Sequence, residues 1–201
     1  MWENLIGRSL PFWRGAYGRL QETFPDALGG VPLEEWYRAV NSVRPSFIRV
    51  EADEVTYNLH VIIRFELELA LLEGELDADG LPAAWNELYR ELLGVTPPDD
   101  LVGCLQDVHW SHGLIGYFPT YTLGNIMSVQ LFDAMRRAMP DLDGQIEAGE
   151  FSRILGWLRE NVHRHGSRYQ PQELLEQATG SRLDAGPYLR YLKDKFGPLY
   201  G

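Results

Sequence analysis

The segment richest in side chains capable of chemistry covers residues 107–124, DVHWSHGLIGYFPTYTLG. His109 and His112 carry imidazoles that titrate near neutral pH, and Tyr117 and Tyr121 carry phenols. Glycines and a proline let the backbone turn sharply and approach a ligand closely. A rigid turn presenting these groups is a candidate wall of an active site. The alternative is an aromatic-rich turn that packs its rings into a core.

A second set of polar side chains lies in an otherwise apolar stretch, about residues 53–73. Four of them follow steps of four, three and four residues, which places them on one helical face: Asp53, Tyr57, His60 and Arg64. Buried ionisable groups are costly unless they are paired. This face therefore needs partners, whether it is a network that joins helices or the wall of a pocket, and the spacing leaves both open.

Other residues with metal or thiol chemistry give weaker signals. The single cysteine, Cys104, excludes an intrachain disulfide and a cysteine-based zinc site, and a buried apolar role is favoured over a nucleophilic one. His163 and His165 could bind a metal, but they lack carboxylate support and also suit a helix C-terminus. The acidic loop at residues 76–81 lacks a full calcium pattern and is expected to be a solvated turn.

Two motifs identify a family resemblance. GYFPTYTLG with DVHWSHG before it, and IRVEAD at residues 48–53, resemble signatures of the carboxypeptidase Taq family, metallopeptidase family 32 (M32). The ends of the chain, with WEN and GRS near residue 2 and WLREN and HRHG near residue 160, are also similar. The resemblance covers essentially the whole chain and corresponds to the C-terminal part of the family's usual length.

The resemblance implies one half of a zinc-type carboxypeptidase that removes C-terminal residues from peptides. Family members hold zinc with a His-Glu-x-x-His helix and a later glutamate, and this sequence contains neither motif. No metal ligand is therefore assigned, and zinc or another divalent metal is expected only in a complete enzyme. The chain alone is expected to be inactive.

The same resemblance assigns the catalytic candidates. His109 or His112, and Tyr117 or Tyr121, would donate hydrogen bonds to the oxyanion of the tetrahedral intermediate.

It also assigns the substrate-binding candidates. Arg49 would bind the free carboxylate of a peptide, since a guanidinium fork matches a carboxylate. Asp53 would orient that arginine or the metal-binding helix, and Tyr57 and His60 would border the site.

A second class of function remains open. The chain is then a stand-alone, non-catalytic peptide-binding or regulatory protein that pairs with a full-length carboxypeptidase. Either reading should leave apolar surface exposed around the helix at residues 53–73, and such patches usually become interfaces. We therefore expect a homodimer, or binding to the missing N-terminal half or a full-length relative.

The charge of the chain argues against two classes of binding partner. The chain has 201 residues, a formal net charge of -11 and a sequence pI near 4.9. This acidity argues against nucleic acid and against an anionic membrane surface. No signal peptide or long apolar run is present, and the single thiol fits a cytoplasmic location.

The elements that must position these side chains are helices. The periodicity predicts an all-α, or mainly α, array forming one side of a cleft within a single domain over residues 1–201, with a short β element near residues 45–52. Helices are expected in about residues 2–24, 32–43, 53–73, 82–93, 99–105, 123–139, 151–162, 171–179 and 184–196.

Overall fold

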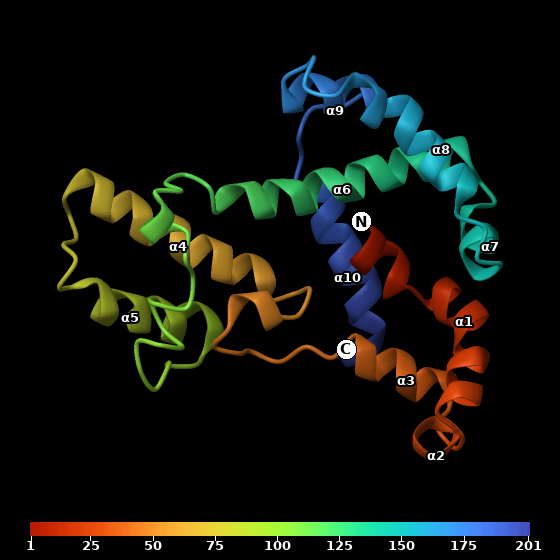
Figure 1. Ribbon diagram of the computed structural model, residues 1–201, viewed down its shortest axis with the longest axis horizontal. Helices are drawn as coiled ribbons and strands as arrows, with labels where there is room; N and C mark the ends of the chain where they lie inside the picture. The colour runs from red at the N-terminus through yellow and green to blue at the C-terminus, as the bar shows by residue number, and fades with distance from the viewer. The chain divides into compact units, whose positions relative to one another are not determined.

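The computed structural model describes residues 1–201, and all of its regular structure is helical, with no β-strand (Figure 1). The α-helices are α1 (Leu10–Thr23), α2 (Pro25–Leu28), α3 (Leu33–Val40), α4 (Tyr57–Glu73), α5 (Leu81–Leu93), α6 (Pro119–Ala138), α7 (Leu142–Glu147), α8 (Ser152–Asn161), α9 (Pro171–Thr179) and α10 (Gly186–Tyr200). A π-helical turn covers Trp2–Gly7, and 3-10 turns cover Arg49–Glu51, Trp110–His112 and His163–His165. The prediction of an all-α fold is confirmed.

The chain divides into two compact units. The first unit comprises Met1–Asn41 and Asn125–Gly201, and the second unit comprises Ser42–Gly124. Each unit has its own apolar core, as described below. The predictions of one domain over residues 1–201 and of a cleft stay predictions.

In the first unit, α1 begins at Leu10, inside the helix expected over residues 2–24, because Ser9 caps it there. Ser9 Oγ accepts a hydrogen bond from the backbone N–H of Phe12 at 3.3 Å, and Pro11 occupies the first turn. Tyr17 on this helix donates to the carbonyl of Val31 at 2.8 Å and so ties the following loop to α1. The core of this unit consists of Leu5, Ile6, Val129, Phe132, Met135, Met139, Leu142, Ile146, Ile154, Leu158 and Tyr188.

In the second unit, α4 packs against α5. Asp53 caps the turn that leads into α4, and Gly74 ends the helix with a left-handed φ of 76°. The core between the two helices consists of Ile63, Leu67, Trp85, Tyr89, Leu93 and Cys104. Burial raises the pKa of the Cys104 thiol, which suits the predicted apolar role.

Two sequence-based expectations are wrong, and two short helices, α2 and α7, were not expected. Residues 45–52 form no β element, because the extended chain there has no partner strand and closes into a 3-10 turn at Arg49–Glu51. Residues 99–105 form turns in place of a helix: Leu101 and Leu105 stay 74% and 68% exposed, so no packing stabilises a helix there.

No helix in the chain combines the length and the apolar character needed to cross a membrane. The cytoplasmic location stays a prediction.

Candidate functional site

Asp107 is the centre of a buried charged network in the second unit. Its Oδ1 accepts from Arg49 Nη2 at 2.7 Å, and its Oδ2 accepts from Arg64 Nε at 2.6 Å. Arg49 is 4% exposed and Arg64 is fully buried. Burial opposes ionisation of Asp107, but the hydrogen bonds from Arg49 and the charge of Arg64 prevail and lower the pKa of its carboxyl. Two guanidinium groups share one carboxylate, so these three residues carry an excess positive charge.

The backbone around Arg49 is fixed by Gln106. The backbone N–H of Arg49 donates to Gln106 Oε1 at 2.8 Å, and Gln106 Nε2 donates to the carbonyl of Phe47 at 2.9 Å. The segments at residues 47–49 and 106–107 therefore lie side by side. This pairing, together with the 3-10 turn after Ile48, directs Arg49 toward Asp107.

Aromatic rings surround the Arg49 guanidinium. Its central carbon lies 4.9 Å from the centre of the Tyr121 ring, 5.7 Å from that of Phe118 and 5.8 Å from that of Tyr57. Contacts of a cation with ring faces at this range are attractive. Tyr57 also accepts a hydrogen bond from Arg49 Nη1 through its hydroxyl at 2.9 Å.

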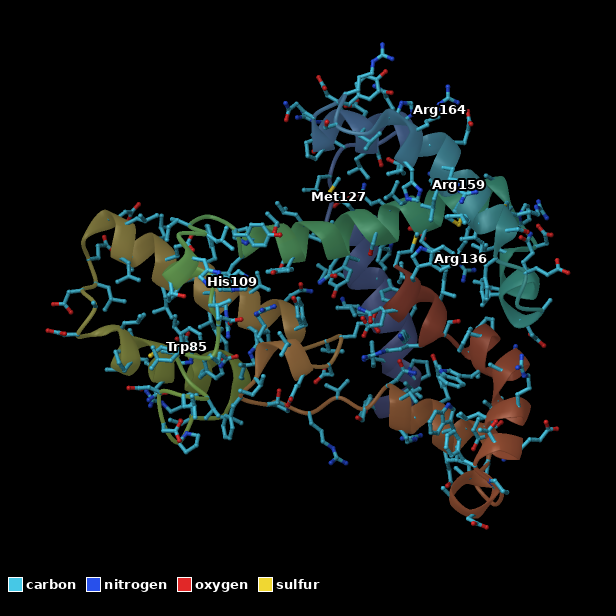
Figure 2. All side chains as sticks on the ribbon, viewed as in Figure 1. Trp85, His109, Met127, Arg136, Arg159 and Arg164 are labelled. Carbon is cyan, nitrogen blue, oxygen red and sulfur yellow. The ribbon has the colours of Figure 1, made fainter.

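His109 and Tyr121 form a hydrogen-bonded pair beside this arginine. His109 Nε2 lies 2.9 Å from the Tyr121 hydroxyl, and the His109 ring packs on Phe118 with centres 4.4 Å apart. Figure 2 marks His109 within this unit. Burial lowers the pKa of His109 and raises the pKa of Tyr121. At neutral pH the pair therefore consists of an uncharged imidazole and a protonated phenol, which can donate hydrogen bonds.

Glu68 holds the segment between Trp110 and Gly116 against α4. Its carboxylate accepts from Trp110 Nε1 at 2.6 Å and from the backbone N–H of Gly116, and the residue is 4% exposed. Tyr117, directly after Gly116, is 43% exposed, and its ring centre lies 5.5 Å from that of Tyr121. Glu68 thus helps to place the solvent-accessible phenol of Tyr117 beside Tyr121.

The structure brings most of the predicted site residues into one cluster. Its members are Arg49, Tyr57, His109, Tyr117 and Tyr121.

The other three predicted residues are not part of this cluster, although the carbonyl of His60 accepts a hydrogen bond from Arg64. Asp53 accepts from the backbone N–H groups of Val55 and Thr56 at 2.9 and 3.0 Å and acts as a cap. His60 is fully buried, with Nδ1 3.0 Å from the Tyr89 hydroxyl. His112 is exposed on its 3-10 turn.

Sequence reasoning did not assign roles to Asp107, Gln106 and Glu68. Asp107 begins the motif DVHWSHG, two residues before His109, and its carboxylate is the available partner for the two arginines. Glu68 lies one helical turn after Arg64, so it extends the polar stripe of α4. The four-residue spacing from Arg64 could have identified Glu68 in the sequence. Only the fold shows that Asp107 pairs with both arginines.

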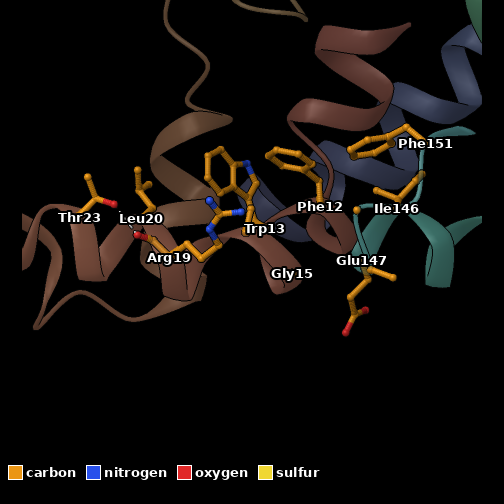
Figure 3. A pocket seen from close by; sticks show the side chains of 12 residues that line it. Phe12, Trp13, Gly15, Arg19, Leu20, Thr23, Ile146, Glu147 and Phe151 are labelled. Atoms are coloured by element: carbon orange, nitrogen blue, oxygen red, sulfur yellow. Dashed lines mark hydrogen bonds between the residues drawn. The ribbon is translucent and has the colours of Figure 1, made fainter.

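The chain contains no group of three or more His, Cys, Asp or Glu side chains arranged to hold a metal ion. A cavity of about 620 Å³ lies in the first unit, and none of the cluster residues lines it (Figure 3). Its walls are largely apolar, and Phe12, Trp13, Ile146 and Phe151 contribute to them.

Comparison with known proteins supplies the family. Residues 1–196 match the model of the carboxypeptidase Taq (M32) metallopeptidase family. The chain belongs to the M32 family. The chain is 52% identical over 200 residues to thermostable carboxypeptidase 1 of Thermus thermophilus, and 45% identical over 199 residues to carboxypeptidase 1 of Bacillus subtilis.

Solved structures agree with these sequence relatives. The M32 carboxypeptidase of Deinococcus radiodurans R1 is similar with a TM-score of 0.96 and 54% identity, covering 100% of this chain and 40% of that chain. The apo-Mg structure of Pyrococcus furiosus carboxypeptidase gives a TM-score of 0.93 at 45% identity and covers 97% of this chain and 39% of that one.

The M32 chain spans only part of the length of these relatives. The matches cover 100% of this chain but 39% of the Thermus thermophilus protein, and 99% of this chain but 40% of the Bacillus subtilis protein. This agrees with the expectation that the chain corresponds to a portion of such a protein.

Proposed function

We propose that this chain supplies the peptide-holding part of an M32 metallocarboxypeptidase, which removes residues from the C-termini of peptides. The observation that supports this most strongly is the network in which Asp107 is shared by Arg49 and Arg64 beside three tyrosines and a histidine. An excess positive charge next to hydrogen-bond donors suits a peptide carboxylate and a developing oxyanion.

Arg49 is the proposed carboxylate-binding residue. Asp107 occupies the Nε and Nη2 side of its guanidinium, and Tyr57 accepts from Nη1. Each terminal nitrogen of a guanidinium carries two N–H groups, so one remains on Nη1 and one on Nη2. These two form the end of the fork and match a carboxylate bidentately. The rings of Tyr57, Phe118 and Tyr121 cover the guanidinium, so the anion must approach along its edge.

His109, Tyr121 and Tyr117 are the proposed donors to the oxyanion. Neutral His109 has one N–H and protonated Tyr121 has one O–H; the hydrogen bond between them uses one of these donors, so one stays available at neutral pH. Tyr117 is exposed beside them and can reach a bound peptide. Asp53 and His60 then act indirectly, through the cap of α4 and through Tyr89, and His112 lies at the exposed edge of the turn.

The residues of this chain do not fit a metal site. We therefore assign no metal ligand to them, and zinc or another divalent ion is expected only in a complete enzyme. We expect the chain alone to bind peptides without hydrolysing them.

The test is to co-produce this chain with the part of the Thermus thermophilus carboxypeptidase that it does not match. The measurement is release of the C-terminal residue from a peptide acid, with the peptide amide as comparison. Arg49→Gln should raise KM for the acid roughly 10- to 100-fold, since hydrogen bonds to charged groups contribute about 1.5–3 kcal/mol. Tyr121→Phe should lower kcat roughly 100-fold, the loss typical of one oxyanion donor.

The matched control is His163→Gln, which changes an exposed histidine in the first unit and should alter neither parameter. The proposal fails if the complex forms but does not hydrolyse the peptide acid. It also fails if the Arg49→Gln variant keeps the full preference for the acid over the amide.

The same cluster supports a second candidate, a non-catalytic peptide-binding protein that pairs with a full-length carboxypeptidase. The buried excess charge and the exposed Tyr117 can bind a peptide C-terminus without any metal. Calorimetry of the chain alone should then show binding of the peptide acid and no binding of the peptide amide. This candidate is favoured if, in addition, the complex with the other part does not hydrolyse the peptide acid.

A further inference from the structure

Helix α4 is apolar on two opposite sides, and only one side is covered. Its inner side packs on α5 through Ile63 and Leu67, which are 0% and 3% exposed. Its outer side carries a stripe with spacings of three, four and three residues: Ile62, Phe65, Leu69 and Leu72. These four side chains are 40%, 42%, 40% and 65% exposed. An apolar stripe along a helix normally faces other protein rather than solvent.

The turn that follows the charged network adds to this surface. Glu68 binds both Trp110 and the backbone of Gly116, so it holds the intervening segment against α4. Leu114 and Ile115 in this segment are 41% and 52% exposed. We define the α4 patch as the four stripe residues together with Leu114 and Ile115. Contiguous exposed apolar surface of this kind marks an interaction site.

The lengths of the relatives point to the occupant. The chain matches the Thermus thermophilus carboxypeptidase over its own full length but over only 39% of that protein, so most of the relative lies outside the match. The α4 patch belongs to the same unit as the proposed peptide-holding cluster, and Glu68 binds Gly116, which lies in the chain between Ile115 of the patch and Tyr117 of the cluster. A partner bound at the patch therefore lies beside the residues that it would need to complete a hydrolytic site.

We propose that the α4 patch is the docking surface for the part of an M32 carboxypeptidase that this chain does not match. This inference rests on the proposed function, since it names the partner that the peptide-holding cluster requires. Apolar side chains of the partner would cover the stripe, and no ion pair is needed at its centre. A single charge introduced into the stripe should then oppose docking, because burying an unpaired charge is costly.

The test is co-production of the tagged full chain with the unmatched part of the Thermus thermophilus protein, followed by quantification of both polypeptides after purification on the tag. Leu69→Asp and Phe65→Asp should lower the recovered partner at least roughly 10-fold, the effect of about 1.4 kcal/mol on an equilibrium. Leu189→Asp is the matched control: Leu189 on α10 is 54% exposed in the first unit, and its substitution should leave recovery unchanged. Thermal unfolding of each variant alone, followed by circular dichroism, should show the midpoint of the unmodified chain, because all three residues are exposed.

The outcomes separate this inference from the proposed function. Equal recovery with all variants, or no recovery with the unmodified chain, would overturn the docking surface. A dimer of this chain that Leu69→Asp dissociates would overturn it too, because the occupant would be a second copy. Loss of recovery confined to the α4 variants supports docking even if the recovered complex does not hydrolyse peptides, in which case only the proposed function fails.

Discussion

At His60, a buried imidazole joins the hydrogen-bond network of Tyr89. His60 Nδ1 lies 3.0 Å from the Tyr89 hydroxyl, which itself lies 3.1 Å from the carbonyl of Phe47. The ring is fully buried, and its Nε2 has no hydrogen-bond partner in the chain. Burial and the charge of Arg64 lower the pKa of His60 from 6.5 to about 4. The folded protein therefore holds this histidine neutral.

The lowered pKa of His60 predicts a dependence of stability on pH. Between about pH 4 and pH 6.5 the unfolded chain binds a proton that the folded chain does not, so the free energy of unfolding should rise with pH across this window. The total change is about 3 kcal/mol, since one pKa unit corresponds to about 1.4 kcal/mol. Urea unfolding at several pH values measures it.

The control compares two histidine variants. His60→Gln should reduce the slope, whereas His163→Gln, at an exposed position, should keep it. Some slope should remain in the His60 variant, because burial also lowers the pKa of His109. An unchanged slope in His60→Gln would show that His60 is not the group that titrates.

At the scale of elements, the packing of α1 depends on a glycine. A β-carbon at Gly15 would overlap the backbone carbonyl of Glu147 on α7, lying 2.8 Å from its carbon. Three residues further along the same helix, a β-carbon at Gly18 would meet nothing within 4 Å. The two glycines therefore serve different purposes: one permits close approach of two helices, and the other only weakens α1.

The same substitution at these two positions should have opposite effects. Gly15→Ala should destabilise the chain by about 1–3 kcal/mol, the usual cost of overpacking, because the obstacle is backbone and cannot rotate away. Gly18→Ala should stabilise it by about 0.5–1 kcal/mol through helix propensity. Denaturant unfolding of both variants checks this, and destabilisation by Gly18→Ala would contradict it.

At the scale of the whole molecule, each unit has its own core and its own buried polar residues. The Asp107 network lies entirely within residues 42–124, whereas the core centred on Met135 and Ile154 lies in the other unit. A substitution that destabilises one unit should therefore first speed hydrogen exchange of the backbone amides in that unit.

Asp107→Asn tests this directly. The variant leaves two buried guanidinium groups without their carboxylate, which typically costs about 3–5 kcal/mol. Hydrogen exchange in α4 and α5 should quicken by at least roughly 100-fold, with little change in α8. Asp143→Asn, which breaks an exposed pair with Arg136, is the matched control and should change exchange in neither unit by much. Equal acceleration in both units would contradict the prediction.

Local rules explain what could be predicted. Ser9 with Pro11, and Gly74 after the apolar stretch, identify the start of α1 and the end of α4 because capping and left-handed turns depend on neighbours in sequence. Residues 45–52 and 99–105 were mispredicted because their propensities favour regular structure that no packing partner stabilises.

The sequence by itself determined the helical class, most of the longer helices, the M32 family and the motif that carries His109, Tyr117 and Tyr121. Only the tertiary structure decided that Asp107 pairs with both Arg49 and Arg64, that Glu68 holds the turn at Gly116, and that His60 is buried behind Tyr89. Helix periodicity and capping act within a few residues and can be read from the chain. Pairing of buried charges acts across 40 to 60 residues of sequence, between Arg64 or Arg49 and Asp107, and depends on which segments the fold brings together.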